Sequence, residues 1–213
     1  MALTTSAADR LEIGGAVLES RLIHGTGRFP SDAVLRECLE AARPTMITLA
    51  IRRLALEGGR NELEAIDLSG YTLLPNTAGA TTVDQAVRLA RLARAASLSD
   101  LIKVEVIGDE RTLLPDPAAT LEATRRLVDD GFTVLPYCSD DVVLALRLEE
   151  AGAAAVMPGA APIGTTLGIQ NPPEMARAFA EAVAAGRRAH LAGRASISLE
   201  AVASSPRPGM VGS

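Results

Sequence analysis

The sequence predicts an α/β fold, and within that class a TIM-barrel-like (β/α)8 arrangement with six recognisable strands. Two observations carry this prediction. Short apolar runs alternate with longer stretches of helical pattern, and the runs recur every 21 to 31 residues. Each run is also followed by a polar, Gly-rich or Pro-rich turn, and in a barrel the turns after the strands build the active site.

The expected strands are continuous apolar runs, which is typical of parallel strands covered on both faces. They span residues 21–25, 46–51, 71–76, 101–107, 132–137 and 153–158. An open doubly wound sheet is the alternative, because it also places its site at the carboxyl ends of the strands. The barrel is preferred because the repeat is even and no GxGxxG motif follows a strand.

Helices are expected between the strands. Residues 81–96 repeat apolar side chains with a period of 3.6. Residues 117–130 have Pro117 just inside their start and Gly131 just past their end, which is the usual capping asymmetry. Residues 139–152 open with capping residues. After a last helix over residues 173–193 no seventh or eighth strand follows, whereas a complete barrel has eight strands in about 250 residues.

Composition and charge exclude several classes of protein. Hydrophobic residues make up 48% of the chain and aromatic residues only 2%, so the core must be aliphatic. The net charge of −5 argues against a nucleic-acid binder. Two cysteines without a CxxC motif and a start without a secretory pattern predict a cytoplasmic protein. The longest weakly apolar stretch is broken by prolines and glycines, so no membrane span is expected.

Lys103 is the only lysine in the chain, and it lies inside the expected strand LIKVEVI. Alternate strand residues share a face, so Lys103 and Glu105 should point into the barrel while Ile102 and Val104 pack against helices. Burial disfavours a charged ammonium, and a partly neutral lysine can attack a carbonyl and form a Schiff base. Glu105 would then move protons for that chemistry or pair with the charge.

A Lys–Glu ion pair on an exposed strand is the alternative interpretation, because structural ion pairs show the same pattern. The catalytic interpretation is favoured by the scarcity of lysine. Arginine cannot form an imine, so a chain that uses arginine elsewhere would still need a lysine at position 103 for this chemistry.

Other candidate site residues lie in small-residue turns. The NTAG motif begins with Asn76 and Thr77; we assign it to substrate binding through a close backbone approach, with an ordinary tight turn as the alternative. The stretch 159–168 could cradle a phosphate with its amides or be a flexible loop. His24 could be catalytic or structural. Cys138 is expected to be a buried, inert thiol.

Taken in order, these segments resemble the thiazole synthase family of thiamine biosynthesis, whose members build the thiazole phosphate ring. The matching stretches cover nearly the whole chain, and LPNTAG followed by IKVEVIGDERTLLPD is specific to that family. Further matches are SRLIHGTGR, ITLAIRR, GFTVLPYCSDD, AAVMPGAAPIG and GIQNP.

The resemblance implies a barrel in which Lys103 forms an imine with 1-deoxy-D-xylulose 5-phosphate and Glu105 acts as an acid or base. It also implies that Gly164 contributes to substrate binding. Dehydroglycine, made by a separate enzyme, and a thiocarboxylate on a small sulfur-carrier protein would supply the remaining atoms. The family needs no metal or bound organic cofactor for ring closure, and it forms homo-oligomers.

The sequence departs from the family after GIQNP. Members carry two further strands there: one has an Asp-Ala-Gly-Ile-Gly motif with an acid/base aspartate, and the next ends in an Asn-Thr pair that helps hold the phosphate. Neither motif is present. The expectation is a single domain over residues 1–213 with an internal deletion near 172–173, which would leave two sheet edges unpaired.

Three functions are compatible with these features. The first is a thiazole synthase, a transferase that condenses the ketose phosphate, dehydroglycine and carrier-bound sulfur through a lysine Schiff base. The second is a catalytically degenerate relative, which would be a binding or oligomer partner or an unstable deletion product; the missing motifs favour it. The third is an aldolase-like lyase on a shortened barrel, which explains Lys103 and Glu105 but not the ordered set of motifs.

Overall fold

A six-stranded parallel sheet forms the centre of the computed structural model, which describes residues 10–27, 29–54, 66–159 and 172–193. The strands are β3 (Ile23–Gly25), β4 (Met46–Ala50), β5 (Thr72–Asn76), β6 (Leu101–Val104), β9 (Thr133–Cys138) and β10 (Met157–Pro158). All six lie within or overlap the expected apolar runs. Each lies beside the previous strand of the sheet, and all neighbours are parallel. This order is that of a barrel wall, and it excludes a doubly wound sheet, whose order reverses at a switch point.

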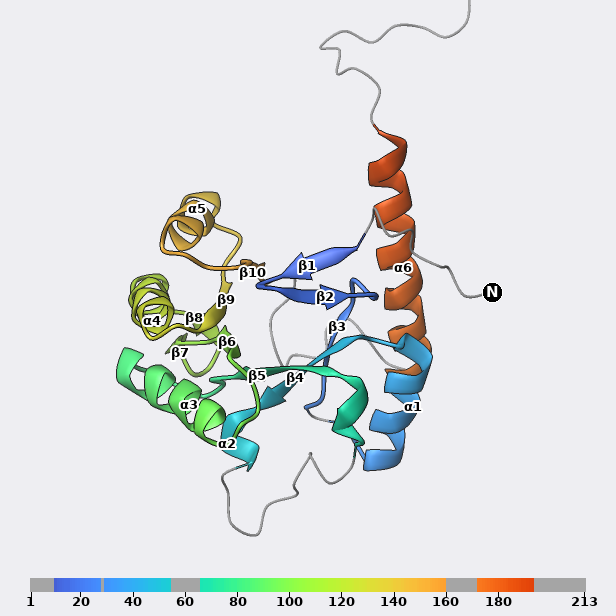
Figure 1. Cartoon of the computed structure of the whole chain (residues 1–213), viewed down its shortest axis with the longest axis horizontal. Helices are drawn as coiled ribbons and strands as arrows, with labels where there is room; N and C mark the ends of the chain where they lie inside the picture. Colours follow the sequence, from blue (N-terminus) through green and yellow to red (C-terminus); the bar gives the residue numbers. More distant parts are fainter. Residues whose placement is uncertain (1–9, 28, 55–65, 160–171, 194–213) are drawn as a thin grey trace, which may run out of the picture.

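The helices lie outside the curved sheet (Figure 1). They are α1 (Asp32–Ala42), α2 (Ile51–Leu54), α3 (Val83–Ala95), α4 (Pro117–Asp129), α5 (Val142–Glu150) and α6 (Pro172–Ala192), with a short 3-10 turn, η2 (Leu68–Gly70). Helix α6 packs against α1, beside β3, and α5 lies beside β10 at the other edge. Among the described residues no helix lies between α5 and α6, so the arc is open on that side.

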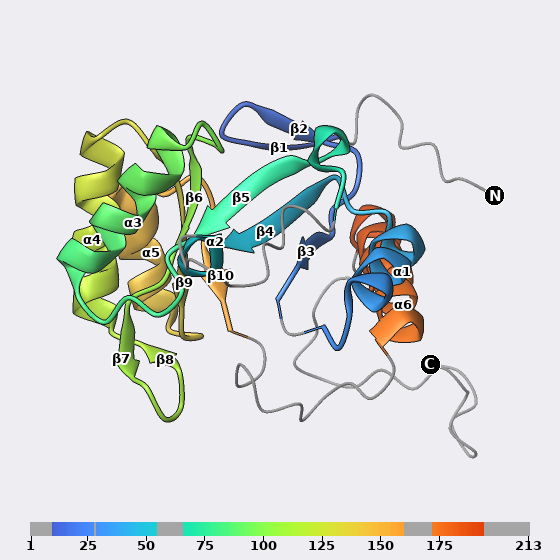
Figure 2. The ribbon, with the colours of Figure 1, turned by 90° about the horizontal axis from the view of Figure 1, so that it is seen from below.

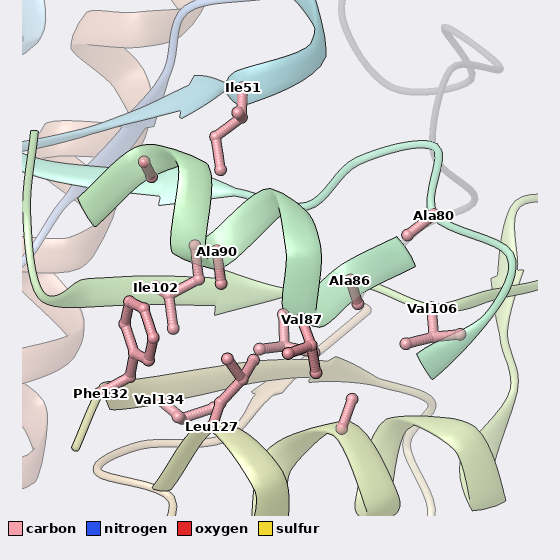
Figure 3. Packing of buried hydrophobic residues seen from close by; sticks show 13 residues of the cluster. Ile51, Ala80, Ala86, Val87, Ala90, Ile102, Val106, Leu127, Phe132 and Val134 are labelled. Carbon is pink, nitrogen blue, oxygen red and sulfur yellow. The ribbon is translucent and has the colours of Figure 1, made fainter. Parts of the chain in front are cut away.

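The outer hydrophobic core lies between the strands and the helices α3 and α4 (Figure 3). The helices contribute mostly small residues, such as Ala86 and Ala90, which let them approach the sheet closely. Ile102, Val104 and Val134 fill the sheet side of this core. Apart from Phe132 the cluster is aliphatic, as the composition predicts.

A short hairpin of strands β1 (Leu11–Ile13) and β2 (Ala16–Leu18) precedes the sheet and was not predicted from the sequence. Its turn consists of Gly14 and Gly15, both with positive φ of 55° and 83°. Such backbone angles are those of the tight hairpin turns that favour glycine. A Cβ atom on Gly14 would also overlap the side chain of Thr133, so glycine is required there for packing as well.

The hairpin covers an apolar layer inside the arc. Four successive strands contribute one large side chain each to this layer, which packs against Ile13 and Leu18: Met46, Leu74, Leu101 and Leu135. The residues next to them on the strands belong to the outer cores instead, as the two-residue alternation of a strand requires.

Strand β6 is shorter than the apolar run LIKVEVI suggests. It ends at Val104, and the chain then leaves the sheet to form a hairpin of β7 (Ile107–Asp109) and β8 (Leu114–Pro115). This hairpin projects beyond the end of the sheet in Figure 2. The expected strand over 101–107 was therefore too long by its last three residues, because Val106 and Ile107 are buried outside the sheet.

We expect the hairpin's inner side chain to contribute strongly to stability. Leu18 is 1% exposed in the inner layer, while its neighbour Val17 is 48% exposed. Replacing Leu18 by Ala should lower the free energy of unfolding by about 2–5 kcal/mol, because it removes buried methyl groups and leaves a cavity. Val17→Ala should change it by less than about 0.5 kcal/mol. Equal effects of the two substitutions in urea denaturation would contradict this packing.

Candidate functional site

A polar layer lies directly above the apolar layer, at the carboxyl ends of the strands. Two residues beyond Leu74, Leu101 and Leu135 on their strands come Asn76, Lys103 and Tyr137. The register places Asn76 opposite Lys103 and Lys103 opposite Leu135. Because Leu101 belongs to the inner layer and Ile102 to the outer core, Lys103 faces the interior as expected.

Lys103 and Glu105 form an ion pair in this layer. The Nζ atom of Lys103 lies 2.7 Å from Oε1 of Glu105, and the two side chains are 17% and 10% exposed. The ion pair of the alternative interpretation is thus present, but it does not lie on an exposed strand: Glu105 is buried and Lys103 is half-buried. Burying two charges requires close pairing to offset their lost hydration, and such pairs in a cleft are candidates for function.

The backbone of Glu105 is held by Thr77. Thr77 Oγ1 accepts a hydrogen bond from the amide of Glu105 and donates one to the carbonyl of Glu105, both at 2.8 Å. The amide of Thr77 donates to the carbonyl of Lys103 at 3.1 Å. These bonds join the ends of β5 and β6 beyond the regular ladder.

The NTAG turn lies beside the ion pair. Asn76 is 8% exposed, and its Oδ1 accepts a hydrogen bond from the amide of Ala78 at 3.2 Å. Thr77 is fully buried. Substrate binding by Asn76 and Thr77 stays a prediction: Asn76 adjoins Lys103 in register, whereas the polar groups of Thr77 contact the protein itself.

Tyr137 is a site residue that the sequence analysis did not assign. The Nζ atom of Lys103 lies 5.5 Å from the centre of its ring, within the range of a cation–π interaction. Burial raises the pKa of the Tyr137 phenol, and the negative charge of Glu105 raises it further. The signal was available, because Tyr137 shares a strand face with Thr133 and Leu135.

Gly159, just after β10, packs against this tyrosine. A Cβ atom at Gly159 would lie 3.2 Å from Cε2 and 3.3 Å from the hydroxyl oxygen of Tyr137. The absence of a side chain therefore lets the backbone approach the ring. Gly164 and the rest of the stretch that was expected to cradle a phosphate lie outside the described residues.

His24 and Cys138 point away from the site. His24 stacks on Phe29, with ring centres 5.9 Å apart, and its Nδ1 lies 2.7 Å from the carbonyl oxygen of Gly25. Burial lowers the pKa of His24, opposed by the Gly25 hydrogen bond. Cys138 packs against Leu144 and Leu148, the two buried residues of α5. Burial raises the pKa of the Cys138 thiol. A raised thiol pKa and full burial agree with an inert cysteine.

Two classes of feature are absent from the described part of the chain. No group of three or more His, Cys, Asp and Glu side chains there could hold a metal ion. None of the helices in the same ranges is long and apolar enough to cross a membrane.

The fold and the site together define a class of protein: a singly wound β/α barrel wall that holds a largely shielded lysine–glutamate pair at the carboxyl end of one strand. The family model described as thiazole biosynthesis protein ThiG matches residues 12–174 and 170–206. The chain belongs to the ThiG family.

Curated relatives agree with this assignment. The thiazole synthase of Bacillus velezensis is 56% identical over 164 residues, which cover 76% of this chain and 65% of that protein. The thiazole synthases of Bacillus subtilis and Geobacillus thermodenitrificans are also 56% identical over 164 residues, covering 64% of their own lengths. The chain therefore matches slightly less than two thirds of the length of these relatives.

A solved structure confirms the fold. The crystal structure of the Amycolatopsis orientalis BexX/CysO complex contains a chain that superposes with a TM-score of 0.75 at 24% sequence identity. The superposition covers 89% of this chain and 98% of that chain. At this level of identity the likeness concerns the fold.

The position of Tyr137 predicts how its phenol ionises. In a Tyr71→Phe background Tyr137 is the only tyrosine, so ultraviolet absorbance during an alkaline titration reports its phenol alone. We expect ionisation above the ordinary pKa of tyrosine, because burial and the Glu105 charge both disfavour the phenolate. Glu105→Gln should lower the midpoint without restoring the ordinary value, since burial remains. The exposed Glu110→Gln is the matched control, and equal midpoints in the two variants would contradict this arrangement.

Proposed function

We propose that this chain acts as a thiazole synthase, a transferase in which Lys103 captures 1-deoxy-D-xylulose 5-phosphate as an imine. The observation that carries the proposal is the close pair of half-buried Lys103 and buried Glu105 inside the barrel wall of a ThiG family member. A lysine next to a proton acceptor in a partly desolvated site is the arrangement that Schiff-base chemistry requires.

Imine formation needs two proton transfers that Glu105 can perform. The ammonium of Lys103 first gives a proton to the carboxylate 2.7 Å away, which frees the amine to attack the ketone carbon. A carbon–nitrogen bond forms as the carbonyl π bond breaks, and one proton of the attacking nitrogen passes to the ketone oxygen to give a carbinolamine. Glu105 then returns a proton to that hydroxyl, which leaves as water while the imine forms.

The other proposed roles are substrate contacts near Lys103 and the sources of the remaining ring atoms. Asn76 lies in register beside Lys103, and Gly164 follows β10; both are proposed substrate contacts, and the backbone of Thr77, rather than its hydroxyl, is the third. Dehydroglycine and a thiocarboxylate on a small sulfur-carrier protein would supply the other ring atoms. The similarly folded BexX forms a complex with CysO, which supports a protein partner here.

Cys38 and Cys138 are buried free thiols, in keeping with a cytoplasmic protein.

A catalytically degenerate family member that acts as a binding or oligomer partner is the second candidate. The observation in its favour is the open side of the arc. Strands β3 and β10 are the edges of the described sheet, and α5 exposes three apolar side chains there: Val142 at 82%, Val143 at 59% and Leu146 at 55%. A groove of about 420 Å³ lies between α5 and residues 153–156.

The shortened chain supports this second candidate in another way. The two stretches that match the family model meet near residues 170–174, where an internal deletion was expected. We infer one domain over residues 1–213 that lacks about two βα units of a complete barrel. Those units would have covered the exposed face of α5.

Trapping with borohydride tests the catalytic proposal. Incubation of the chain with 1-deoxy-D-xylulose 5-phosphate and borohydride should give a covalent adduct on Lys103, detected by peptide mass spectrometry. Because Lys103 is the only lysine, Lys103→Arg should abolish the adduct while keeping the positive charge. Glu105→Gln should slow trapping by roughly 10²-fold or more, the usual contribution of a proton-transfer group.

Two results would decide against this proposal. An adduct that persists in Lys103→Arg would show that another amine reacts. No adduct in a folded wild-type protein would favour the degenerate relative. Circular dichroism of each variant provides the control for folding.

Sedimentation tests the second candidate. If α5 is covered by another copy, the wild-type chain should associate reversibly with rising concentration. Val142→Asp combined with Leu146→Asp should then yield monomers, because two charges would enter an apolar contact. Val17→Asp on the β1–β2 hairpin is the matched control and should associate like wild type, since Val17 is 48% exposed and does not line the groove beside α5. A wild-type monomer at all concentrations would rule out self-association.

A further inference from the structure

Thr77 occupies an unusual place in the site, because its hydroxyl serves the backbone of one residue twice. Its Oγ1 accepts from the amide of Glu105 and donates to the carbonyl of Glu105, each at 2.8 Å. Thr77 is fully buried and Glu105 is 7% exposed. A threonine hydroxyl has one donor and two acceptor sites, so both bonds can exist at the same time.

The Thr77 hydroxyl supplies the hydrogen bonds that a neighbouring strand would otherwise give to Glu105, just past the end of the ladder between β5 and β6. The ladder between β5 and β6 reaches only the pair Asn76 and Lys103, and the amide of Thr77 adds one bond to the carbonyl of Lys103. The carbonyl of Thr77 accepts from the amide of Ala80 at 3.0 Å in the following turn. The amide and carbonyl of the buried Glu105 therefore depend on the Thr77 side chain, since an unsatisfied buried backbone group is strongly unfavourable.

This geometry fixes Glu105 relative to Lys103. The backbone of Glu105 lies just past β6 and cannot be held by the ladder alone. Its carboxylate nevertheless lies 2.7 Å from the Lys103 ammonium. We propose that Thr77 is a positioning residue that sets the distance between the lysine and its proton-transfer partner by clamping the backbone of Glu105. The expected effect of Thr77 on turnover rests on the proposed function, whereas its effect on the position of Glu105 does not.

A role for Thr77 in the stability of the fold alone would give different results. A purely structural hydroxyl would change the melting temperature but not the reactivity of Lys103. Thr124 offers the matched control, because it is also fully buried and its hydroxyl donates to the carbonyl of Thr120 at 2.8 Å within α4. Thr124→Val thus removes a comparable hydrogen bond away from the site.

The single lysine makes the test direct. Acetylation of Lys103 by a water-soluble active ester at fixed pH, followed by mass spectrometry of its peptide, reports how strongly the amine is paired and shielded. Glu105→Gln should raise the rate by roughly three- to tenfold, because the ammonium loses its carboxylate. Thr77→Val should raise it in the same direction, since a displaced carboxylate pairs less well and shields the amine less. Thr77→Ser keeps the hydroxyl and should stay within about twofold of wild type.

Hydrogen exchange and turnover complete the test. The amide of Glu105 should exchange at least about tenfold faster in Thr77→Val than in wild type, and Thr77→Ala serves if the valine variant does not fold. With an active enzyme, Thr77→Val should lower kcat with little change in KM for the ketose phosphate, and Thr77→Ser should recover it. Wild-type acetylation and exchange rates in folded Thr77→Val or Thr77→Ala would overturn the inference. Absence of imine trapping in wild type would refute the proposed function but not this clamp.

Discussion

The parallel ladder from β3 to β10 is the constraint on which the rest of the structure depends. It fixes the register of six strands, and the two-residue alternation along each strand then assigns every side chain to the interior or to the helices. In β6 this alternation puts Leu101 in the inner apolar layer and Lys103 in the polar layer above it. The apolar layer and the β1–β2 hairpin close the interior from below, so Lys103 is both shielded and directed towards the carboxyl ends of the strands.

Much of this arrangement could be predicted from the sequence because strands covered on both faces are continuous apolar runs. All six strands of the sheet were expected, and the inward direction of Lys103 followed from alternation alone. The hairpin of β1 and β2 was missed because strands of three residues carry too little periodic signal. The run LIKVEVI was assigned one strand because the sequence does not reveal that the Thr77 side chain takes over from the ladder at Glu105. Tyr137 was overlooked although alternation along β9 places it on the same face as Leu135; what the sequence alone does not show is its closeness to Lys103 on the neighbouring strand.

The two ends of the barrel wall differ in how they are covered by helices. Helix α6 packs against α1 beside β3, so one end of the wall has a covering helix, while α5 at the other end exposes apolar side chains. The buried side chains of the inner layer come from β4, β5, β6, β9 and the β1–β2 hairpin, and Ile23 and Met157 of the edge strands pack against them. The Lys103–Glu105 pair lies at the end of β6, a central strand. The groups that we propose for the first chemical step therefore lie on a central strand of the described sheet rather than at its edges.

The choice of lysine at position 103 follows from the same geometry. A guanidinium could also pair with Glu105, and the chain uses arginine at every other cationic position apart from two histidines. Arginine stays protonated and cannot form an imine, whereas a lysine can give its proton to an adjacent carboxylate. Burial matters for this transfer because it removes the hydration that would otherwise stabilise both charges. The proposed imine chemistry needs a free amine, and the carboxylate oxygen 2.7 Å from Nζ of Lys103 can accept the proton that must leave. The protein rather than solvent has to hold this distance.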